Sequence, residues 1–381
     1  MRIPIAAVSL PLLAIASCGS APSGDSAVPS ATQPPFKVAQ VGTETFNEGW
    51  AISLEPRSGR IFITEKGGTM KVVDPQTGQR GSVGGIPQVA YGGQGGLADF
   101  IFAPDYAKSH GIYLSWAEAG DGGNKGGAVG KGTLDCPALD KCAIDGLKVI
   151  WRQQPKVPGV LQYALRMTFS PDGKYLFVSS GDRVAIDYVQ KTDNNLGKIV
   201  RLLPDGSAAP GNPFAGKGSP ADQIWTIGHR NPLGLKFDPH GQLWDLEHGP
   251  MGGDEINKLV PGDNYGWPIV SNGDNYNGTP IPRHSTHPEF HAPAISWNPV
   301  IAPGGMIFYS GKLWPDWKDQ AIIAGMKTQA IIRVALSGDH GTEEARYDMG
   351  HRIRGLAEAA DGSLFVIEDG QGGRLLHLTP K

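Results

Sequence analysis

The chain has 381 residues, including 54 glycines and 31 prolines, and its formal net charge is −3. So many turn-forming residues predict short segments joined by tight turns. The near balance of charge, without a basic stripe, excludes nucleic acid as an expected partner.

The N-terminal segment, residues 1–17, has the order of a signal peptide. Arg2 supplies a positive charge, an apolar run broken by two prolines follows, and small residues lead to Cys18. The run is too short and too interrupted to span a membrane. Because the residues before Cys18 resemble a bacterial lipobox, we expect a lipid anchor on Cys18, with plain secretion as the alternative. Gly19 favours the outer membrane by the usual sorting rule, so we expect a periplasmic lipoprotein.

The composition changes after the signal peptide. Residues 18–36 are rich in Ser, Ala, Pro and Gly and predict a flexible tether. The remaining residues, 37–381, would often be divided into two domains on length alone. A repeated pattern predicts a single domain instead.

This pattern recurs six times, and the fifth copy is degenerate. A β-prone residue leads into a turn of Pro, Asp and Gly, and an aromatic or aliphatic strand follows, as in residues 169–178. The copies begin near Leu54, Phe102, Phe169, Phe237, Phe308 and Glu358. Strand-rich repeats of about 60 residues predict one four-stranded antiparallel blade per repeat. Six copies therefore predict an all-β, six-bladed β-propeller, whose loops converge around a central channel.

Two cysteines, Cys136 and Cys142, lie six positions apart in a stretch rich in Gly and Pro. In an oxidising compartment we expect them to form a local disulfide, with two free thiols as the alternative. A zinc site would need further ligands nearby.

Two polar segments suit an anionic ligand with carbonyl groups. Gln94 lies in a glycine-flanked turn, and Arg230 is followed directly by Asn231. A forked guanidinium beside an amide suits a carboxylate or a quinone oxygen. In isolation, each segment can also be read as an ordinary surface turn.

The densest polar segment runs over residues 247–257 and continues over residues 264–268. Its glycines let the backbone turn sharply and expose carbonyl groups, and Asp254, Glu255 and Tyr265 add oxygen atoms. Calcium binds hard oxygens, including backbone carbonyls, so the segment is a candidate calcium site. An acidic turn between blades is the alternative.

Three cations near the C-terminus complete the candidate set. Arg352 and Arg354 face the same way if they lie on a strand, and such a pair usually shares an anion, although a solvated pair is the alternative. Lys327 follows the strand of the fifth repeat and could reach the same place. With the two polar segments, these cations fit a flat tricarboxylate quinone beside calcium. An acidic sugar or a phosphate fits the set less specifically.

Four motifs in this order make the chain resemble the soluble aldose (glucose/sorbosone) dehydrogenases that use pyrroloquinoline quinone (PQQ). The motifs lie at residues 93–97, 229–232, 247–268 and 352–354. The resemblance implies quinone binding by Gln94, Arg230, Asn231, Tyr276, Lys327, Arg352 and Arg354. It implies that the backbone carbonyls of Gly249 and Pro250 bind the calcium beside the quinone, and that Glu255 and Tyr265 bind structural calcium.

The implied reaction oxidises an aldose to a lactone. A base removes the proton of the anomeric hydroxyl, and hydride passes from that carbon to the quinone. Calcium and Arg230 stabilise the charge that develops on the quinone oxygens, and the electrons leave to an external acceptor. Asp182 matches a carboxylate on the substrate side.

The chain departs from the family at the catalytic histidine. That histidine lies four residues before the arginine matching Arg166, and Gln162 occupies its position. A glutamine side chain cannot accept a proton near neutral pH, and loss of a general base lowers a rate by about 10²–10⁴. We expect Asp182 to be the replacement base, ahead of His229 and His248.

The candidate catalytic positions are therefore Gln162, Asp182 and Arg230. The leading hypothesis is PQQ-dependent oxidation of aldoses. The second is a propeller that binds PQQ or an anionic sugar with weak or no turnover, which Gln162 favours. The third is a calcium-dependent, lactonase-like hydrolase, although the excess of Arg and Lys does not favour it.

Overall fold

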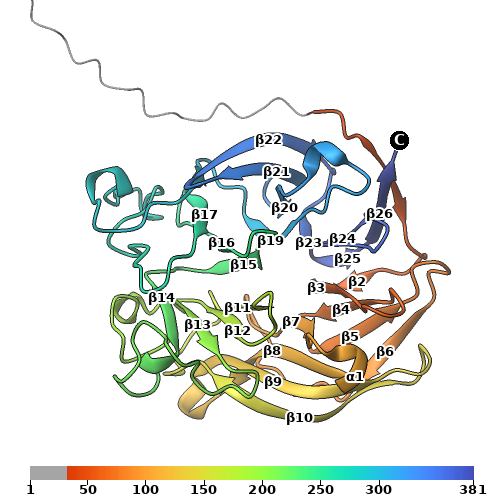
Figure 1. Cartoon of the computed structure of the whole chain (residues 1–381), viewed down its shortest axis with the longest axis horizontal. Helices are drawn as coiled ribbons and strands as arrows, with labels where there is room; N and C mark the ends of the chain where they lie inside the picture. Colours follow the sequence, from red (N-terminus) through yellow and green to blue (C-terminus); the bar gives the residue numbers. More distant parts are fainter. Residues whose placement is uncertain (1–31) are drawn as a thin grey trace, which may run out of the picture.

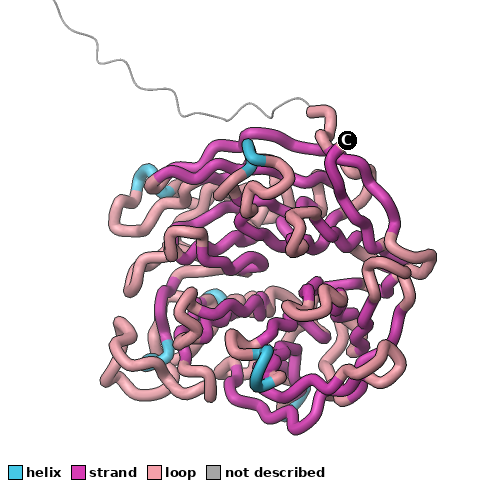
Figure 2. Tube along the Cα trace, turned by 45° about the vertical axis from the view of Figure 1, so that its right-hand side comes forward, coloured by secondary structure: helices cyan, strands magenta, loops and turns pink. Residues whose placement is uncertain are grey.

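Short strands and the turns and loops that join them make up nearly all of the computed structural model, which describes residues 32–381 (Figures 1 and 2). The predicted signal peptide, Cys18 and most of the predicted tether lie outside the described residues. Within this range there are 26 strands and one α-helix, α1 (Tyr106–Ser109). None of the helices between residues 32 and 381 is long and apolar enough to cross a membrane.

The strands form four sheets of four strands, one sheet of eight strands and one of two. Three of the four-stranded sheets are antiparallel meanders. One consists of β11 (Ala164–Phe169), β12 (Leu176–Ser180), β13 (Lys198–Leu202) and β14 (Ile224–Ile227), and the next of β15 (Pro232–Phe237), β16 (Leu243–Glu247), β17 (Asp254–Lys258) and β18 (Ile295–Trp297). The third consists of β19 (Pro303–Phe308), β20 (Ala321–Gly325), β21 (Ala330–Ser337) and β22 (His340–Asp348). The fourth has the order β1 (Phe36–Gln40), β26 (Leu375–Pro380), β24 (Leu364–Glu368) and β23 (Ile353–Glu358). The eight-stranded sheet has the order β3 (Gly49–Leu54), β4 (Ile61–Glu65), β5 (Thr69–Val73), β6 (Arg80–Gly84), β10 (Cys142–Arg152), β9 (Lys125–Asp135), β8 (Gly111–Ala119) and β7 (Leu97–Phe102), and β2 (Phe46–Asn47) pairs with β25 (Gln371–Gly373).

The middle of the molecule is lined by the innermost strands β3, β7, β11, β15, β19 and β23, each of which contacts the next, while β23 contacts β3 (Figure 1). Each predicted repeat begins at the end of one of these strands, and its turn leads to the antiparallel partner strand. The all-β fold and the antiparallel sheets arranged around a centre are therefore confirmed. The first residues of the innermost strands meet on one face of the ring.

At one place, two sets of four strands are joined into a single sheet and do not form two separate four-stranded sheets. β6 and β10 pair in parallel over two residue pairs, which joins β3–β6 to β7–β10 in a single sheet. Only glycine allows this approach, because a Cβ atom on Gly81 would lie 1.6 Å from the carbonyl oxygen of Leu139. Cys136 and Cys142 form the predicted disulfide in this same segment. The cross-linked loop therefore lies against β6.

The two ends of the described chain meet in one sheet, because β1 pairs antiparallel with the last strand, β26. Phe36, the last residue assigned to the tether, lies in β1 and is 2% exposed. Its ring contacts those of Trp314, Trp317 and Tyr347 at centroid distances of 6.3, 6.3 and 5.5 Å. This aromatic cluster fixes the strand that closes the ring.

We expect Phe36→Ala to lower the free energy of unfolding by about 3–5 kcal/mol, because it removes a buried ring and leaves a cavity. Val38→Ala is the matched control, since Val38 lies in the same strand and is 48% exposed. Urea denaturation followed by tryptophan fluorescence measures both variants. Equal losses in the two variants would mean that the aromatic contacts do not stabilise the closure.

Candidate functional site

A cavity of about 240 Å³ lies where the first residues of the innermost strands meet. All six innermost strands contribute, through their first residues or those just before them, together with the residues that follow β4, β16 and β20. The structure brings together four predicted quinone-binding residues here, namely Gln94, Asn231, Arg352 and Arg354. Residues at the starts of β7, β15 and β23, or in the loops that lead into them, thus converge on one cavity.

Arg352 and Arg354 share one anion, as the sequence pattern indicated. The guanidinium nitrogens of both residues lie 2.7 Å from Asp369, each on a different carboxylate oxygen. Burial would raise the pKa of Asp369, but the two guanidinium groups lower it below its ordinary value. Two cations against one carboxylate leave a net positive charge beside the cavity.

The lysine of the cavity is Lys66, which sequence reasoning missed. Its ammonium group donates to the carbonyl of Gly93 at 3.0 Å and lies 2.5 Å from Glu48. The side chain of Lys327 is exposed, and its neighbour Met326 lines the cavity in its place. The signal for Lys66 was its position directly after the second strand of the first repeat.

Gln94 and Asn231 both support a backbone segment with unusual conformation. Gln162, Ala164 and Leu165 have φ angles of 54°, 57° and 72°. The side-chain oxygen of Gln94 accepts the N–H of Gln162 at 2.7 Å, and that of Asn231 accepts the N–H of Ala164 at 3.1 Å. Positive φ angles cost free energy in residues other than glycine, and they cluster at functional sites. The two amides therefore hold the segment that carries Gln162.

Gln162 lies between Asp182 and Arg230. With the amide orientation that satisfies its hydrogen bonds, the Gln162 nitrogen donates to Asp182 Oδ1, and the oxygen accepts from Arg230 Nη2 at 2.6 Å. The three predicted catalytic positions are thus in direct contact.

Asp182 is fully buried and has further donors. Its Oδ2 accepts from the indole N–H of Trp267 at 2.7 Å, and its Oδ1 accepts from the N–H of Val184 at 2.8 Å. Burial raises the pKa of Asp182 to about 6, although these donors and Arg230 oppose the rise. The carboxylate can therefore exchange a proton near neutral pH, and the Gln162 amide is one of the groups that cover it.

Arg230 connects the remaining predicted residues. Its Nη1 donates to the carbonyls of Gly249 and His248 at 2.8 and 3.1 Å, and its Nη2 donates to the hydroxyl of Tyr276 at 3.2 Å. Tyr276 is 73% exposed and belongs to the outer rim of the site. A single guanidinium group thus joins the predicted catalytic, quinone and calcium positions.

All four predicted calcium residues line one small cavity of about 10 Å³, a volume suited to a single water molecule or ion. These residues are Gly249, Pro250, Glu255 and Tyr265, and Glu247 joins them. The turn requires glycine, because a Cβ atom on Gly249 would lie 2.2 Å from the carbonyl oxygen of Gly252. The Tyr265 hydroxyl donates to the carbonyl of Lys258 at 2.6 Å, so this group is already engaged.

The two candidate histidine bases lie in different surroundings. His229 is fully buried among Thr226, Asp245 and Glu247, so it does not face the 240 Å³ cavity. His248 lines that cavity, and its Nε2 lies 2.7 Å from the carbonyl of Pro303. Burial lowers the pKa of His248.

Comparisons with known proteins place the chain in one family. The glucose/sorbosone dehydrogenase family model matches residues 46–377. The aldose sugar dehydrogenase YliI of Escherichia coli is 36% identical over 348 residues, which cover 90% of this chain and 92% of that protein. Quinoprotein glucose dehydrogenase B of Acinetobacter calcoaceticus is 26% identical, covering 89% and 88%.

Solved structures share the fold. The apo form of the soluble aldose sugar dehydrogenase from E. coli is 34% identical with a TM-score of 0.84, covering 91% of this chain and 100% of that chain. The PQQ-bound aldose sugar dehydrogenase from Streptomyces coelicolor is 26% identical with a TM-score of 0.74, covering 92% and 100%.

Proposed function

This chain belongs to the glucose/sorbosone dehydrogenase family, and on that premise we propose that it oxidises aldose sugars to lactones with PQQ and an external electron acceptor. The observation that carries the proposal is the convergence on one cavity of Gln94, Asn231 and Arg354, which lie in the loops before β7 and β15 and in β23. Such a set suits an anion with carbonyl groups.

The lining of the cavity fits the quinone. Lys66, Arg352 and Arg354 are cations that can pair with its carboxylates, while Gln94 and Asn231 retain amide groups beside it. Trp50 offers an aromatic surface to a planar ring system. PQQ, when bound, supplies the hydride acceptor, and these residues bind and orient it.

Calcium is proposed at the carbonyls of Gly249 and Pro250, with Glu255 and Tyr265 around the same small cavity. The fit rests on the volume of that cavity and on the sharp glycine turn, which presents backbone oxygens. Calcium would add positive charge beside the quinone. Arg230 lies next to Gly249 and Tyr276, where its guanidinium group can stabilise developing negative charge.

Asp182 is the proposed proton acceptor. Its pKa of about 6 suits a general base near neutral pH. Because the Gln162 amide covers one carboxylate oxygen, the side chain of Gln162 has to move before the sugar hydroxyl can reach Asp182.

We also propose that the ring has six blades, with the eight-stranded sheet counted as two blades that share an outer edge. The periplasmic location and the lipid anchor on Cys18 remain part of the proposal.

Reconstitution tests the function directly. The purified protein, given PQQ and calcium, is expected to reduce an artificial dye with at least one member of a panel of aldoses. Absorbance of the bound quinone reports cofactor binding separately from turnover. If the quinone-loaded protein oxidises none of the aldoses, the proposed enzymatic function is wrong. If the protein does not bind PQQ, both the enzymatic function and the alternative of a PQQ-binding propeller are wrong.

One observation favours a second candidate, a PQQ-binding propeller with weak turnover. Gln162 cannot accept a proton, and it occupies the place between Asp182 and Arg230. The site would then hold the cofactor with the same residues while lacking an efficient base.

We expect Gln162→His to raise kcat for aldoses by up to about 10²-fold, since an imidazole there would accept a proton beside the Asp182 carboxylate. Histidine also tolerates a positive φ angle such as the 54° at this position. Gln162→Ser is the matched control, because it uncovers Asp182 without adding a base. An increase in Gln162→Ser alone would show that uncovering Asp182 suffices, and no increase in a quinone-loaded Gln162→His would show that the missing imidazole does not limit the rate.

A further inference from the structure

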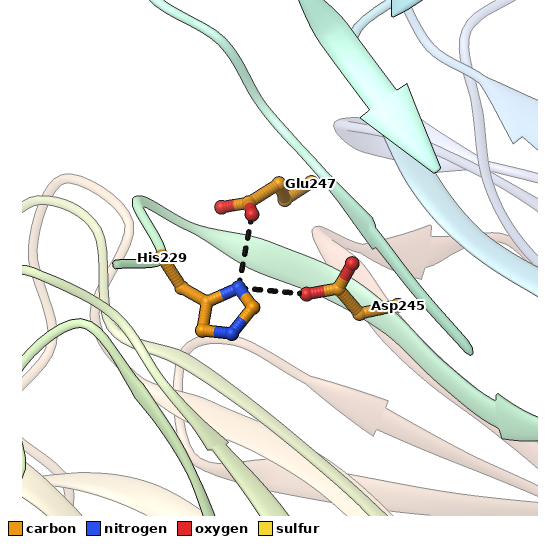
Figure 3. A group of neighbouring side chains, drawn as sticks. All are labelled: His229, Asp245 and Glu247. Atoms are coloured by element: carbon orange, nitrogen blue, oxygen red, sulfur yellow. Dashed lines mark hydrogen bonds and ion pairs between the residues drawn. The ribbon is translucent and has the colours of Figure 1, made fainter. Parts of the chain in front are cut away.

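Three buried side chains converge behind the quinone cavity. Nδ1 of His229 lies 3.0 Å from Asp245 Oδ2 and 3.1 Å from Glu247 Oε1, and both contacts are drawn in Figure 3. Asp245 and Glu247 stand two residues apart on β16 and therefore face the same way. Their side chains and that of His229 are at most 4% exposed. The ligand atoms of all three lie within 4.8 Å of one another.

The orientation of the His229 ring is fixed from its other side. Its Nε2 lies 2.9 Å from the hydroxyl of Thr226, and the ring of Tyr265 stacks on it at a centroid distance of 4.7 Å. In metal sites, one ring nitrogen of a histidine binds the ion while the other makes a hydrogen bond that fixes the ring. Here the hydrogen bond at Nε2 leaves Nδ1 facing the carboxylates, where an ion could bind.

The cluster contains more negative charge than its neighbours neutralise. Glu255 stands directly opposite Glu247 in the β16–β17 register, so three carboxylates lie together. Like charges at such cross-strand positions destabilise a sheet. A buried cation would relieve this repulsion.

Several acceptors in the cluster also lack donors. Both carboxylate oxygens of Asp245 and the side-chain oxygen of Asn257 are buried without a hydrogen-bond donor of suitable geometry. Asn257 stands opposite Asp245, and its nitrogen donates to Glu247 and Glu255 at 3.2 Å each. Unpaired acceptors within a fully buried group are costly unless a cation binds them.

We propose that His229, Asp245 and Glu247 bind a divalent transition-metal ion, with the side-chain oxygen of Asn257 as the fourth ligand. One imidazole nitrogen with carboxylate and amide oxygens suits Zn²⁺ or Mn²⁺ better than Ca²⁺, which takes oxygen ligands alone. The site is distinct from the 10 Å³ cavity of the proposed calcium, whose lining includes Glu247 but neither His229 nor Asp245.

The ion would stabilise the cofactor side of the molecule through Glu247. The other oxygen of this carboxylate, Oε2, accepts the backbone N–H groups of Arg230 and Asn231 at 2.7 and 3.2 Å. These two residues face the proposed quinone and substrate. Fixing Glu247 therefore fixes the turn that carries them.

The alternative to a bound metal ion is a protonated His229, whose extra proton lies between the imidazole and the two carboxylates. Burial alone would lower the pKa of His229, but Asp245 and Glu247 raise it to about 9. A protonated imidazole could then donate from Nδ1 to the carboxylates. The two arrangements differ in whether the stripped protein takes up an ion.

The test uses the full chain after removal of metals with a chelator and back-addition of calcium. With Zn²⁺ or Mn²⁺ in excess, elemental analysis is expected to find one equivalent bound, and Tm is expected to rise by several degrees because the ion binds only the folded state. X-ray absorption of the zinc-loaded parent protein is expected to show one imidazole nitrogen in the coordination shell. This measurement needs no variant and so does not depend on the folding of a mutant.

Variants then assign the ligands. Asp245→Asn is expected to lose the transition metal while it remains folded, and Asp339→Asn is the control, since the side chain of Asp339 is 67% exposed and pairs with Lys258 at the surface. No uptake of Zn²⁺ or Mn²⁺ by the stripped parent would overturn the proposal in favour of the protonated histidine. Retention of the ion in Asp245→Asn, or a coordination shell without imidazole, would overturn it as well.

Discussion

Asp182→Asn is expected to lower kcat/KM for aldoses by about 10²–10⁴-fold, the range observed when a general base is lost. Asparagine keeps the shape of the side chain, and its oxygen can still accept from Trp267 or Val184, so the loss reports the missing charge. The pH profile gives a second measurement. A base has to be unprotonated, so the parent activity should rise as pH increases through about 6, the pKa of Asp182, and level off above it.

The control for this variant is Asp187→Asn, an exposed carboxylate a few residues further along the same loop. It should leave both the rate and the pH profile unchanged. If Asp182→Asn keeps the inflection near pH 6, another group accepts the proton. His248 would then be the next residue to replace, because it lines the same cavity.

The sequence predicted those parts of the molecule that local patterns determine. Turns of Pro, Asp and Gly marked the ends of the innermost strands, although the copy after β19 is degenerate and its residues 309–311 contain neither Pro nor Asp. A turn is encoded by a few adjacent residues, so its position can be read directly. The pairing of β6 with β10 could not be read, because it depends on a close approach at Gly81 between segments far apart in the chain.

In the site, too, the sequence predicted what adjacent residues determine and missed what contacts between distant residues determine. Arg352 and Arg354 were identified because strand periodicity places both on one face, yet their shared partner Asp369 lies just beyond the far end of the neighbouring strand. Lys327 and Lys66 follow equivalent second strands in their repeats. Lys66 lines the cavity and Lys327 does not, because the backbone directs the two side chains differently. The sequence pattern does not reveal this backbone direction.

The buried contacts of Gln162 were also beyond sequence reasoning. Its identity as a departure from the family was visible, but its position between Asp182 and Arg230 depends on the positive φ angles of the segment. These angles are held by Gln94 and Asn231, two residues assigned by resemblance to the quinone. Those residues therefore contribute to the site twice, through the backbone of the segment and through the cavity wall.

Arg166 holds the innermost strands together at the centre of the ring. Its guanidinium group pairs with Asp99 of β7 at 3.1 Å and donates to the carbonyls of Leu233 in β15 and Gly304 in β19 at 2.9 and 2.6 Å. It also lies 3.9 Å from the ring centroid of Trp50 in β3. A single side chain of β11 thus contacts four other innermost strands, and its neighbour Trp50 lines the 240 Å³ cavity.

Arg166→Met is therefore expected to lower the free energy of unfolding by about 3–5 kcal/mol, because it leaves the carboxylate of Asp99 buried without its partner. Arg152→Met removes an exposed ion pair with Glu118 and should cost at most about 1 kcal/mol. The double variant Asp99→Asn/Arg166→Met should recover part of the loss, since it removes the unpaired charge while the amide oxygen introduced in place of the carboxylate can still accept the N–H of Met167. Denaturant unfolding of the parent and the three variants measures these differences. A double variant no more stable than Arg166→Met would assign the effect to the lost strand contacts, and the charge of Asp99 would then have little part in it.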